Sequence, residues 1–191
     1  MRRSLAPPRS FYCLRHGVTD WNRQGLFQGL TDIPLNDDGV AQAHAAGNRL
    51  RQIAIAQIVS SPLVRASKTA EIVAVGTSLP VAIDDGIIEC DFGSLEGQSI
   101  RETMERCGIT AMDDLVSILP ADGEPWSQVA DRSLRCVGKW LEHCRGELLF
   151  VCHDAVMQAM AQALCGHFFH NRHGIPFRFA AADNAWQLEE I

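Results

Sequence analysis

The sequence lacks the features that mark several classes of protein. No apolar run approaches the roughly 20 residues of a membrane-spanning helix, so we expect no membrane partner. Acidic residues outnumber basic ones, with 23 Asp and Glu against 17 Lys and Arg, and the formal net charge is −6. This balance argues against nucleic acid as a partner. Segment 1–8 contains two arginines without an apolar segment behind them, which is not the pattern of a signal peptide.

Cysteine pairs and repeated segments are absent as well. The chain has an odd number of cysteines, seven, and no Cys-x-x-Cys. Because Cys13 and Cys152 lie inside apolar runs, we expect reduced, mostly buried thiols in a cytoplasmic protein. Without low-complexity segments, the 191 residues are expected to form one domain, 1–191, with 1–9 as a loose N-terminal tail.

Strand and helix patterns alternate along the chain. Strands are predicted at 10–15, 57–61, 81–84 and 147–152, and a final hairpin at 177–181 and 185–190. Helices are predicted at 37–53, 62–75, 128–144 and 155–164, with a long polar loop at 17–36 and short helices within 100–119. This order indicates an α/β domain with a mostly parallel, doubly wound sheet, in which ligands bind beyond the carboxyl ends of the strands.

Arg15, His16 and Gly17 directly follow the first predicted strand. The guanidinium of Arg15 is a rigid bidentate donor for a tetrahedral oxyanion such as phosphate. A neutral imidazole at His16 is a good nucleophile near neutral pH and can carry a covalent group. Gly17 would let the backbone approach a ligand closely. Together they predict an anion site that contains its own nucleophile.

The same tripeptide occurs again at 172–174, without an apolar strand before it. We therefore interpret the second copy, which contains His173, as a coincidence in a loop. His167, His170 and Cys165 stand nearby, but their spacing matches no standard zinc pattern. This cluster is expected to form a polar loop near a pocket mouth and not a metal site.

Three other segments carry residues suited to the same chemistry. Arg65 lies near the start of a predicted helix, where the helix N-terminus also favours anions. His153 closes an apolar strand and could donate to a phosphate oxygen. Glu89 follows an apolar pair, and burial there would raise its pKa toward the range of a general acid. Asp91 and Glu96 compete for that role but are expected to be solvated or to brace the loop.

Together these segments resemble the histidine phosphatase superfamily, the phosphoglycerate mutase-like group. The matching stretches are Arg-His-Gly-x-Thr-x-Trp-Asn from Arg15, Asp-x-Pro-Leu-Asn-x-x-Gly-x-x-Gln-Ala from Asp32, Ser-Ser-Pro-Leu-x-Arg-Ala-x-x-Thr-Ala from Ser60, Glu-x-x-Phe-Gly-x-x-Glu-Gly from Glu89, and the strand before His153. They follow the family order over 11–163. The resemblance implies a three-layer α/β/α sandwich and phosphoryl transfer without a metal or other cofactor.

The resemblance also implies a role for each matching residue. It makes His16 the phosphorylated nucleophile and Glu89 the proton donor. Arg15, Arg65 and His153, the last as an imidazolium, would clamp the phosphate and stabilise its charge. The residues expected to bind phosphate or substrate are Arg15, Thr19, Asn22, Gln28, Arg65, His153 and Asp154.

The chain departs from the family pattern at three places. Asp154 follows His153 where the family usually has Gly. A carboxylate beside an anion pocket is unfavourable unless it turns away or pairs with an arginine. Gly123-Glu124-Pro125 stands where Gly-Glu-Ser is common, and Leu95 where Trp is common. These departures leave the core chemistry in place and bear on which substrate fits.

The leading functional hypothesis is hydrolysis of a small-molecule phosphomonoester. The alternative is a phosphoglycerate mutase, which needs a second cationic cluster for its bisphosphorylated intermediate, whereas 100–119 offers only Arg101 and Arg106. A catalytically inactive phospho-ligand binding module is the alternative of another class. It would predict loss of His16, Arg65 or Glu89, all of which are present. A homodimer is compatible with the sequence.

Overall fold

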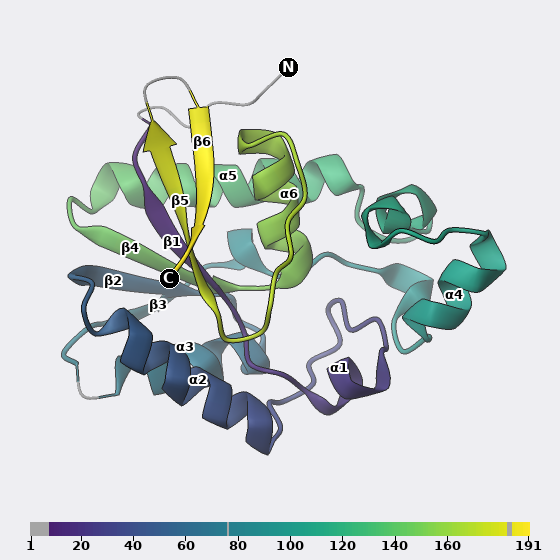
Figure 1. The fold of residues 1–191 in the computed structure, drawn as a ribbon, viewed down its shortest axis with the longest axis horizontal. Helices are drawn as coiled ribbons and strands as arrows, with labels where there is room; N and C mark the ends of the chain where they lie inside the picture. The colour runs from purple at the N-terminus through teal and green to yellow at the C-terminus, as the bar shows by residue number, and fades with distance from the viewer. Residues whose placement is uncertain (1–7, 76, 183–184) are drawn as a thin grey trace.

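The computed structural model describes residues 8–75, 77–182 and 185–191 and contains a six-stranded sheet in the order β3-β2-β4-β1-β5-β6. β3, β2, β4 and β1 run parallel, whereas β5 is antiparallel to β1 and β6 to β5. The strands are β1 (Phe11–Arg15), β2 (Ile55–Ser60), β3 (Val81–Ile83), β4 (Glu147–Cys152), β5 (Pro176–Ala182) and β6 (Ala185–Glu190). The predicted α/β fold with a mostly parallel sheet is confirmed (Figure 1).

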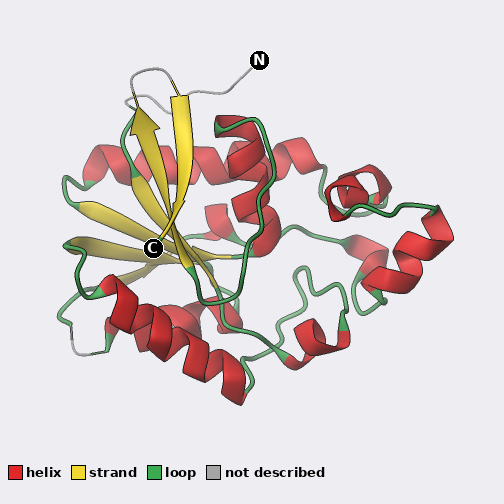
Figure 2. Cartoon of the chain, viewed as in Figure 1, coloured by secondary structure: helices red, strands yellow, loops and turns green. Residues whose placement is uncertain are grey.

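Helices cover both faces of the sheet and extend beyond one end of it (Figure 2). The α-helices are α1 (Asp20–Gln24), α2 (Asp37–Leu50), α3 (Val64–Ala74), α4 (Ile100–Cys107), α5 (Trp126–His143) and α6 (Asp154–Leu164). Short 3₁₀ helices are η1 (Asp85–Ile87), η2 (Gly93–Leu95) and η3 (Met112–Ile118). α5 and α6 share one buried apolar cluster, whereas α2 and α3 contribute to another. None of the described helices has the length and hydropathy to cross a membrane.

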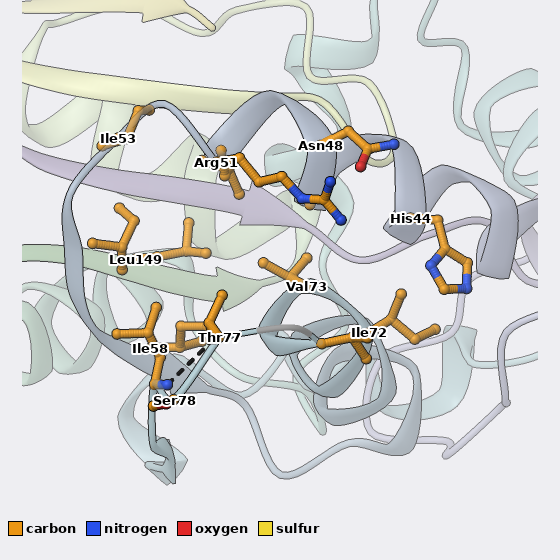
Figure 3. A pocket seen from close by; sticks show the side chains of 15 residues that line it. His44, Asn48, Arg51, Ile53, Ile58, Ile72, Val73, Thr77, Ser78 and Leu149 are labelled. Atoms are coloured by element: carbon orange, nitrogen blue, oxygen red, sulfur yellow. Dashed lines mark hydrogen bonds between the residues drawn. The ribbon is translucent and has the colours of Figure 1, made fainter.

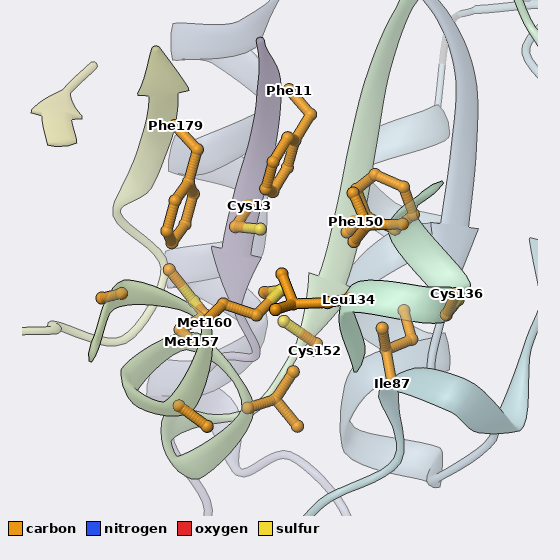
Figure 4. Close-up of a cluster of buried hydrophobic side chains, with 14 of the residues drawn as sticks. Phe11, Cys13, Ile87, Leu134, Cys136, Phe150, Cys152, Met157, Met160 and Phe179 are labelled. Atoms are coloured by element: carbon orange, nitrogen blue, oxygen red, sulfur yellow. The ribbon is translucent and has the colours of Figure 1, made fainter. Parts of the chain in front are cut away.

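The two clusters exist because successive side chains of a strand point to opposite faces of the sheet. Phe11 and Cys13 of β1 lie with Phe150 of β4 in the cluster under α5 and α6 (Figure 4). Leu14 and Val151 of the same two strands lie in the opposite cluster. Since both faces are covered, these central strands are continuously apolar, as buried parallel strands are. Burying each large side chain contributes about 1.5–3 kcal/mol.

The sheet also brings three strand ends together. Because β1, β4 and β2 are parallel neighbours, their carboxyl ends meet at one edge of the sheet. The backbone N–H of His16 donates to the carbonyl of Cys152 at 3.1 Å, and that of Ser61 donates to the carbonyl of Val151 at 3.0 Å. These bonds continue the pairing past the strand ends and hold the segments that carry His16 and His153 side by side.

Gly17 is needed for a close backbone approach within the protein. A Cβ atom there would lie 2.2 Å from the carbonyl oxygen of Gly39, in the first turn of α2. A Cβ on Gly39 would meet the carbonyl oxygen of Val18 in the same way. The two glycines therefore seat the start of α2 against the loop after β1.

Most predicted elements are found within one or two residues of their predicted ends. The polar loop 17–36 contains α1, whose N-cap Thr19 forms a capping box with Asn22. The helix predicted from residue 62 begins at Val64, because Leu63 keeps an extended backbone. The helix predicted to residue 53 ends at Leu50.

The predicted N-terminal tail lies outside the described residues up to residue 7. Within the described part, the expectation of a loose segment is wrong for Arg9. Its guanidinium donates to the carbonyls of Leu141, Cys144 and Gly146 at 2.9, 2.5 and 2.5 Å. Three carbonyls at the end of α5 therefore hold the chain just before β1.

Candidate active site

His16 lies at the carboxyl end of β1 with only 2% of its surface exposed. Its Nδ1 is 2.7 Å from the carbonyl oxygen of Gly17. A carbonyl can only accept, so Nδ1 carries the proton and Nε2 keeps its lone pair. Burial lowers the pKa of His16 well below its ordinary value, and the nearby His153 and Arg65 lower it further. The imidazole is therefore neutral at physiological pH, with Nε2 available as a nucleophile.

His153 immediately precedes α6, and its ring centroid lies 5.1 Å from that of His16. Its Nε2 is 2.7 Å from the hydroxyl of Ser61, which accepts from the backbone N–H of Leu63 at 3.3 Å. The hydroxyl proton can then be donated to Nε2, which leaves the ring proton on Nδ1. Burial and Arg65 lower the pKa of His153 well below its ordinary value. His153 was expected from the sequence to be an imidazolium. In the free protein it is instead neutral, and it can donate through its ring N–H.

Two arginines flank the histidines. Arg65 is fully buried, and its two terminal nitrogens donate to the carbonyls of Thr31 and Gly29 at 2.9 and 2.7 Å. Arg15 donates through Nη1 to the carbonyl of Asn171 at 3.0 Å. Both guanidiniums act on His16 electrostatically and lower its pKa. A desolvated anion placed here would be stabilised by two fixed positive charges.

Three buried nitrogens of residues that act on His16 electrostatically have no hydrogen-bond partner among the described residues: Nε of Arg15, Nε of Arg65 and Nδ1 of His153. Leaving a buried donor without a partner costs about 1–3 kcal/mol. A tetrahedral oxyanion next to the imidazole offers oxygen acceptors to donors of this kind. The residue set therefore fits a phosphate group.

Glu89 supplies the carboxyl group of the site. It is 6% exposed and lines the same cavity as Arg15 and His16. Burial raises its pKa to about 7; the charge of Arg65 opposes that rise and the charge of Asp154 adds to it. Its Oε1 accepts from the backbone N–H of Cys90 at 2.9 Å. A carboxyl with this pKa exchanges a proton near neutral pH, as a general acid and base must.

Arg15, His16 and Glu89 line a cavity of about 150 Å³, whereas Arg65 and His153 are not among its lining residues. A larger hollow of about 630 Å³ lies between α2, α3 and the start of β2, lined by residues that include His44, Arg51 and Val73 (Figure 3). None of the predicted site residues lines that second hollow. The larger hollow is therefore not the candidate site, and the titratable groups select the smaller cavity.

A family model of the histidine phosphatase superfamily (branch 1) matches residues 11–184. The chain belongs to this superfamily. It is 34% identical over 156 residues to the "Uncharacterized phosphatase PhoE" of Bacillus subtilis, covering 81% of this chain and 77% of that one. It is 33% identical over 159 residues to the "Probable phosphoglycerate mutase GpmB" of Citrobacter koseri, covering 81% and 74%. The solved structure of Bacillus stearothermophilus YhfR is 26% identical, with a TM-score of 0.80 over 95% of both chains.

One positioning residue of this histidine phosphatase chain was missed by the sequence analysis. Arg132, on α5, donates to the carbonyls of Glu89 and Ile88 at 3.0 and 2.6 Å. Glu124 holds its guanidinium through two bonds of 2.7 and 2.9 Å. The fixed fork of Arg132 thereby ties the backbone of Glu89 to α5. The available signal was the segment Gly123-Glu124-Pro125, because a half-buried glutamate favours a cationic partner.

The two carboxylates that competed with Glu89 brace the loops, as expected. Glu96 accepts from the backbone N–H groups of Leu30 and Thr31 at 2.8 and 2.9 Å. It thereby fixes the loop whose carbonyls receive Arg65. Asp91 accepts from the backbone N–H of Gly93 at 2.8 Å and does not line the cavity.

Thr19, Asn22 and Gln28 divide into two roles. Asn22 and Gln28 line the cavity as predicted, whereas Thr19 is fully buried behind them and does not line it. The hydroxyl of Thr19 lies 3.1 and 3.0 Å from the amide oxygens of Asn22 and Gln28. Because these oxygens face Thr19, their amide NH₂ groups are the ends free to turn toward a ligand. Thr19 is thus a positioning residue.

Asp154 lies beside the anion pocket, where a carboxylate is unfavourable unless it turns away or pairs with an arginine. It pairs with Arg15. Its Oδ1 lies 3.4 Å from Nη1 of Arg15 and accepts from the amide of Asn171 at 3.0 Å. Asn171 in turn accepts from Arg15 through its backbone carbonyl. The three residues form a closed set of contacts that orients the Arg15 guanidinium.

The second Arg-His-Gly copy lies in a loop, but its interpretation as a coincidence is wrong. The loop returns to the first copy: Nδ1 of His173 is 3.0 Å from the carbonyl of His16, and the backbone N–H of Gly174 donates to that of Arg15 at 3.1 Å. The His173 ring centroid lies 5.4 Å from that of His16, and burial lowers its pKa to about 4. His167 and His170 are exposed. Among the described residues, no group of His, Cys, Asp and Glu side chains could hold a metal ion.

Proposed function

We propose that the protein hydrolyses small-molecule phosphomonoesters in the cytoplasm through a phosphohistidine intermediate on His16. One observation carries the proposal: Nε2 of His16 keeps its lone pair, and the cavity that His16 lines also contains Arg15, whose buried Nε has no partner among the described residues, and a carboxyl with a pKa of about 7. A nucleophile, an oxyanion clamp and a proton donor are thus held together. This combination supports turnover over an inactive binding module, because ligand binding alone would not need Glu89.

The two half-reactions use the same groups in opposite directions. Nε2 of His16 attacks phosphorus in line, a P–N bond forms, and the P–O bond to the alcohol breaks. Glu89 gives its proton to the leaving oxygen. A water molecule then attacks phosphorus while ionised Glu89 takes its proton, and the P–N bond breaks. The products are alcohol and inorganic phosphate, and Glu89 and His16 return to their starting states.

We expect activity to be independent of added metal. Arg15 and Arg65 bring two positive charges to the equatorial oxygens, which is the role that Mg²⁺ has in other phosphoryl-transfer enzymes. Phosphate release from p-nitrophenyl phosphate should therefore be unchanged after dialysis against EDTA. It should be inhibited by vanadate, which adopts the five-coordinate geometry of the transition state. Loss of activity after EDTA with recovery on adding a divalent cation would contradict the proposal.

Mutase activity is the second candidate, favoured by the similarity to probable phosphoglycerate mutases. A mutase must hold and turn a doubly phosphorylated intermediate, which requires cations beyond the first clamp. Arg101 pairs with Glu105 at 2.9 Å, Arg106 donates to Gln98 at 3.1 Å, and neither lines the cavity. With one phosphate clamp in the cavity, we expect the phosphoenzyme to react with water.

The test supplies 3-phosphoglycerate with catalytic 2,3-bisphosphoglycerate and follows inorganic phosphate and 2-phosphoglycerate together. We expect phosphate release to exceed isomerisation at least about tenfold, which corresponds to roughly 1.4 kcal/mol between the two barriers. Isomerisation faster than phosphate release would assign the protein to the mutases. Absence of both reactions, and of turnover of every other phosphomonoester, would favour the binding module.

A further inference from the structure

Much of the wall of the active-site cavity is formed by aromatic and aliphatic side chains. The tilted rings of Phe27 and Phe92 pack together there with centroids 5.3 Å apart, and those of Trp126 and Phe168 do so at 6.1 Å. Leu115, on η3, closes the wall from the side of 100–119. The group that leaves with the ester oxygen therefore meets aromatic and aliphatic side chains once the phosphate is held beside His16.

Polar atoms in this wall are already bonded to the protein. The indole N–H of Trp126 donates to the side chain of Gln162 at 2.8 Å. Both ends of the Gln158 amide bond the backbone of Phe169, at 2.8 and 3.1 Å. The lining amides with a free NH₂ group are Asn22 and Gln28, which the family resemblance assigns to phosphate or substrate binding. The rest of the wall favours a leaving group that needs few hydrogen bonds.

The charges that line the cavity are mostly negative. Arg15 is the single Lys or Arg among the described lining residues, and it is placed for the phosphate and paired with Asp154. The other ionisable side chains are Asp113, Asp154 and Glu89, of which Glu89 is protonated in the form that acts as the acid. A second anionic group on the substrate would lose its water next to carboxylates with no cation to face it, which is strongly unfavourable.

Given the hydrolase activity proposed above, we propose that the site selects phosphomonoesters of uncharged, largely apolar alcohols of about the size of one aromatic ring. The cavity of about 150 Å³ is below the roughly 300–1,000 Å³ of sites that take drug-sized ligands. Phosphoglycerates and sugar bisphosphates, which carry a second anion, are disfavoured by the same lining.

The test compares kcat/KM for three esters with similar leaving oxygens: benzyl, 4-carboxybenzyl and ethyl phosphate. Benzyl phosphate should exceed ethyl phosphate at least about tenfold, because its ring is buried against the aromatic wall. It should also exceed 4-carboxybenzyl phosphate at least about tenfold, because only the carboxylate distinguishes the two. Equal values for the benzyl and 4-carboxybenzyl esters would overturn the inference while leaving hydrolysis established. No phosphate release from any ester would instead contradict the hydrolase activity itself.

Matched variants on η3 locate the selectivity in the cavity. Leu115→Lys adds a cation to the wall and should lower the benzyl to 4-carboxybenzyl ratio about tenfold. Ser117→Lys adds the same charge at an exposed position outside the lining and should keep the wild-type ratio.

A second pair of variants, Asp113→Asn and Asp114→Asn, tests the same inference without relying on the folding of Leu115→Lys. Asp113 lines the cavity, whereas Asp114 does not. At low salt only Asp113→Asn should speed the 4-carboxybenzyl ester, about threefold. Equal ratios within both pairs would overturn the inference.

Discussion

Replacing His16 with alanine is expected to lower turnover by at least about 10⁴-fold, because a covalent nucleophile has no substitute in the site. Nε2 of His16 carries the lone pair that attacks phosphorus, and the alanine variant keeps the clamp but has nothing to accept the phosphoryl group. Brief reaction with ³²P-labelled substrate and a quench that avoids acid should label the wild-type protein. The label should be stable to alkali and lost in acid, as expected of a phosphoramidate. The variant should carry none.

The control must come from a histidine that does not touch His16. His173 is unsuitable, since it bonds the carbonyl of His16 and its removal would disturb the nucleophile. His170, in the same loop, is exposed. His170→Ala should therefore keep both label and turnover. If the His16→Ala variant were labelled like wild type, the nucleophile would have to be sought elsewhere, with His153 as the first candidate.

Replacing Glu89 with glutamine is expected to slow esters of poor leaving groups on the order of 10²–10⁴-fold, the usual contribution of a general acid. Alkyl phosphates such as benzyl phosphate need a proton on the departing oxygen, whereas p-nitrophenyl phosphate leaves as a stable phenolate. Phosphorylation by p-nitrophenyl phosphate should therefore lose no more than about tenfold. Pre-steady-state phosphorylation rates make the comparison, because the second half-reaction is common to both esters.

The pH dependence of the same reaction follows from the two shifted pKa values. Glu89 must be protonated to give its proton, and its pKa of about 7 means that the protonated fraction falls as the pH rises through that value. His16 must be neutral, and its lowered pKa keeps it so into the acid range. For alkyl esters, kcat/KM should therefore be high below about pH 7 and fall above it.

Glu89→Gln should remove that alkaline fall, since glutamine does not titrate. The matched control is Glu96→Gln, in a carboxylate of similar position along the chain that bonds Leu30 and Thr31 and does not line the cavity. It should keep the pH profile and the ratio of leaving groups. Equal losses for alkyl and p-nitrophenyl esters in Glu89→Gln, with the larger loss in Glu96→Gln, would transfer the role of acid to Glu96.

Much of the fold was predictable because its signals are local. Continuous apolar runs in β1 and β4 require burial on both faces, which only a covered parallel sheet provides. The N-cap residue Asn36 indicates the helix that begins after it. In the structure the amide oxygen of Asn36 accepts from the backbone N–H of Gly39 at 3.0 Å. Helix α1 was missed because its five residues carry no apolar periodicity and depend on the cap at Thr19.

The candidate site was predictable where a residue follows a strand within a recognisable motif, as His16, Arg65 and His153 do. It was not predictable where a contact joins distant segments. Arg132 is 43 residues from the carbonyl of Glu89 that it holds, and His173 is 157 residues from the carbonyl of His16. The sequence alone does not show which distant segments come into contact. His173 was therefore interpreted as part of a coincidental repeat, and Arg132 was overlooked.

The sequence by itself determined the order of the strands and of the longer helices, the superfamily resemblance and the residue types available for phosphoryl transfer, because periodicity, capping and short motifs act over a few residues. Only the tertiary structure decided which carboxylate lines the cavity, which ring nitrogen carries a proton and what Gly17 contacts. Those outcomes depend on burial and on hydrogen bonds between segments. The protonation of Glu89, His16 and His153 follows from how much water the folded chain excludes, a property that no short segment has alone.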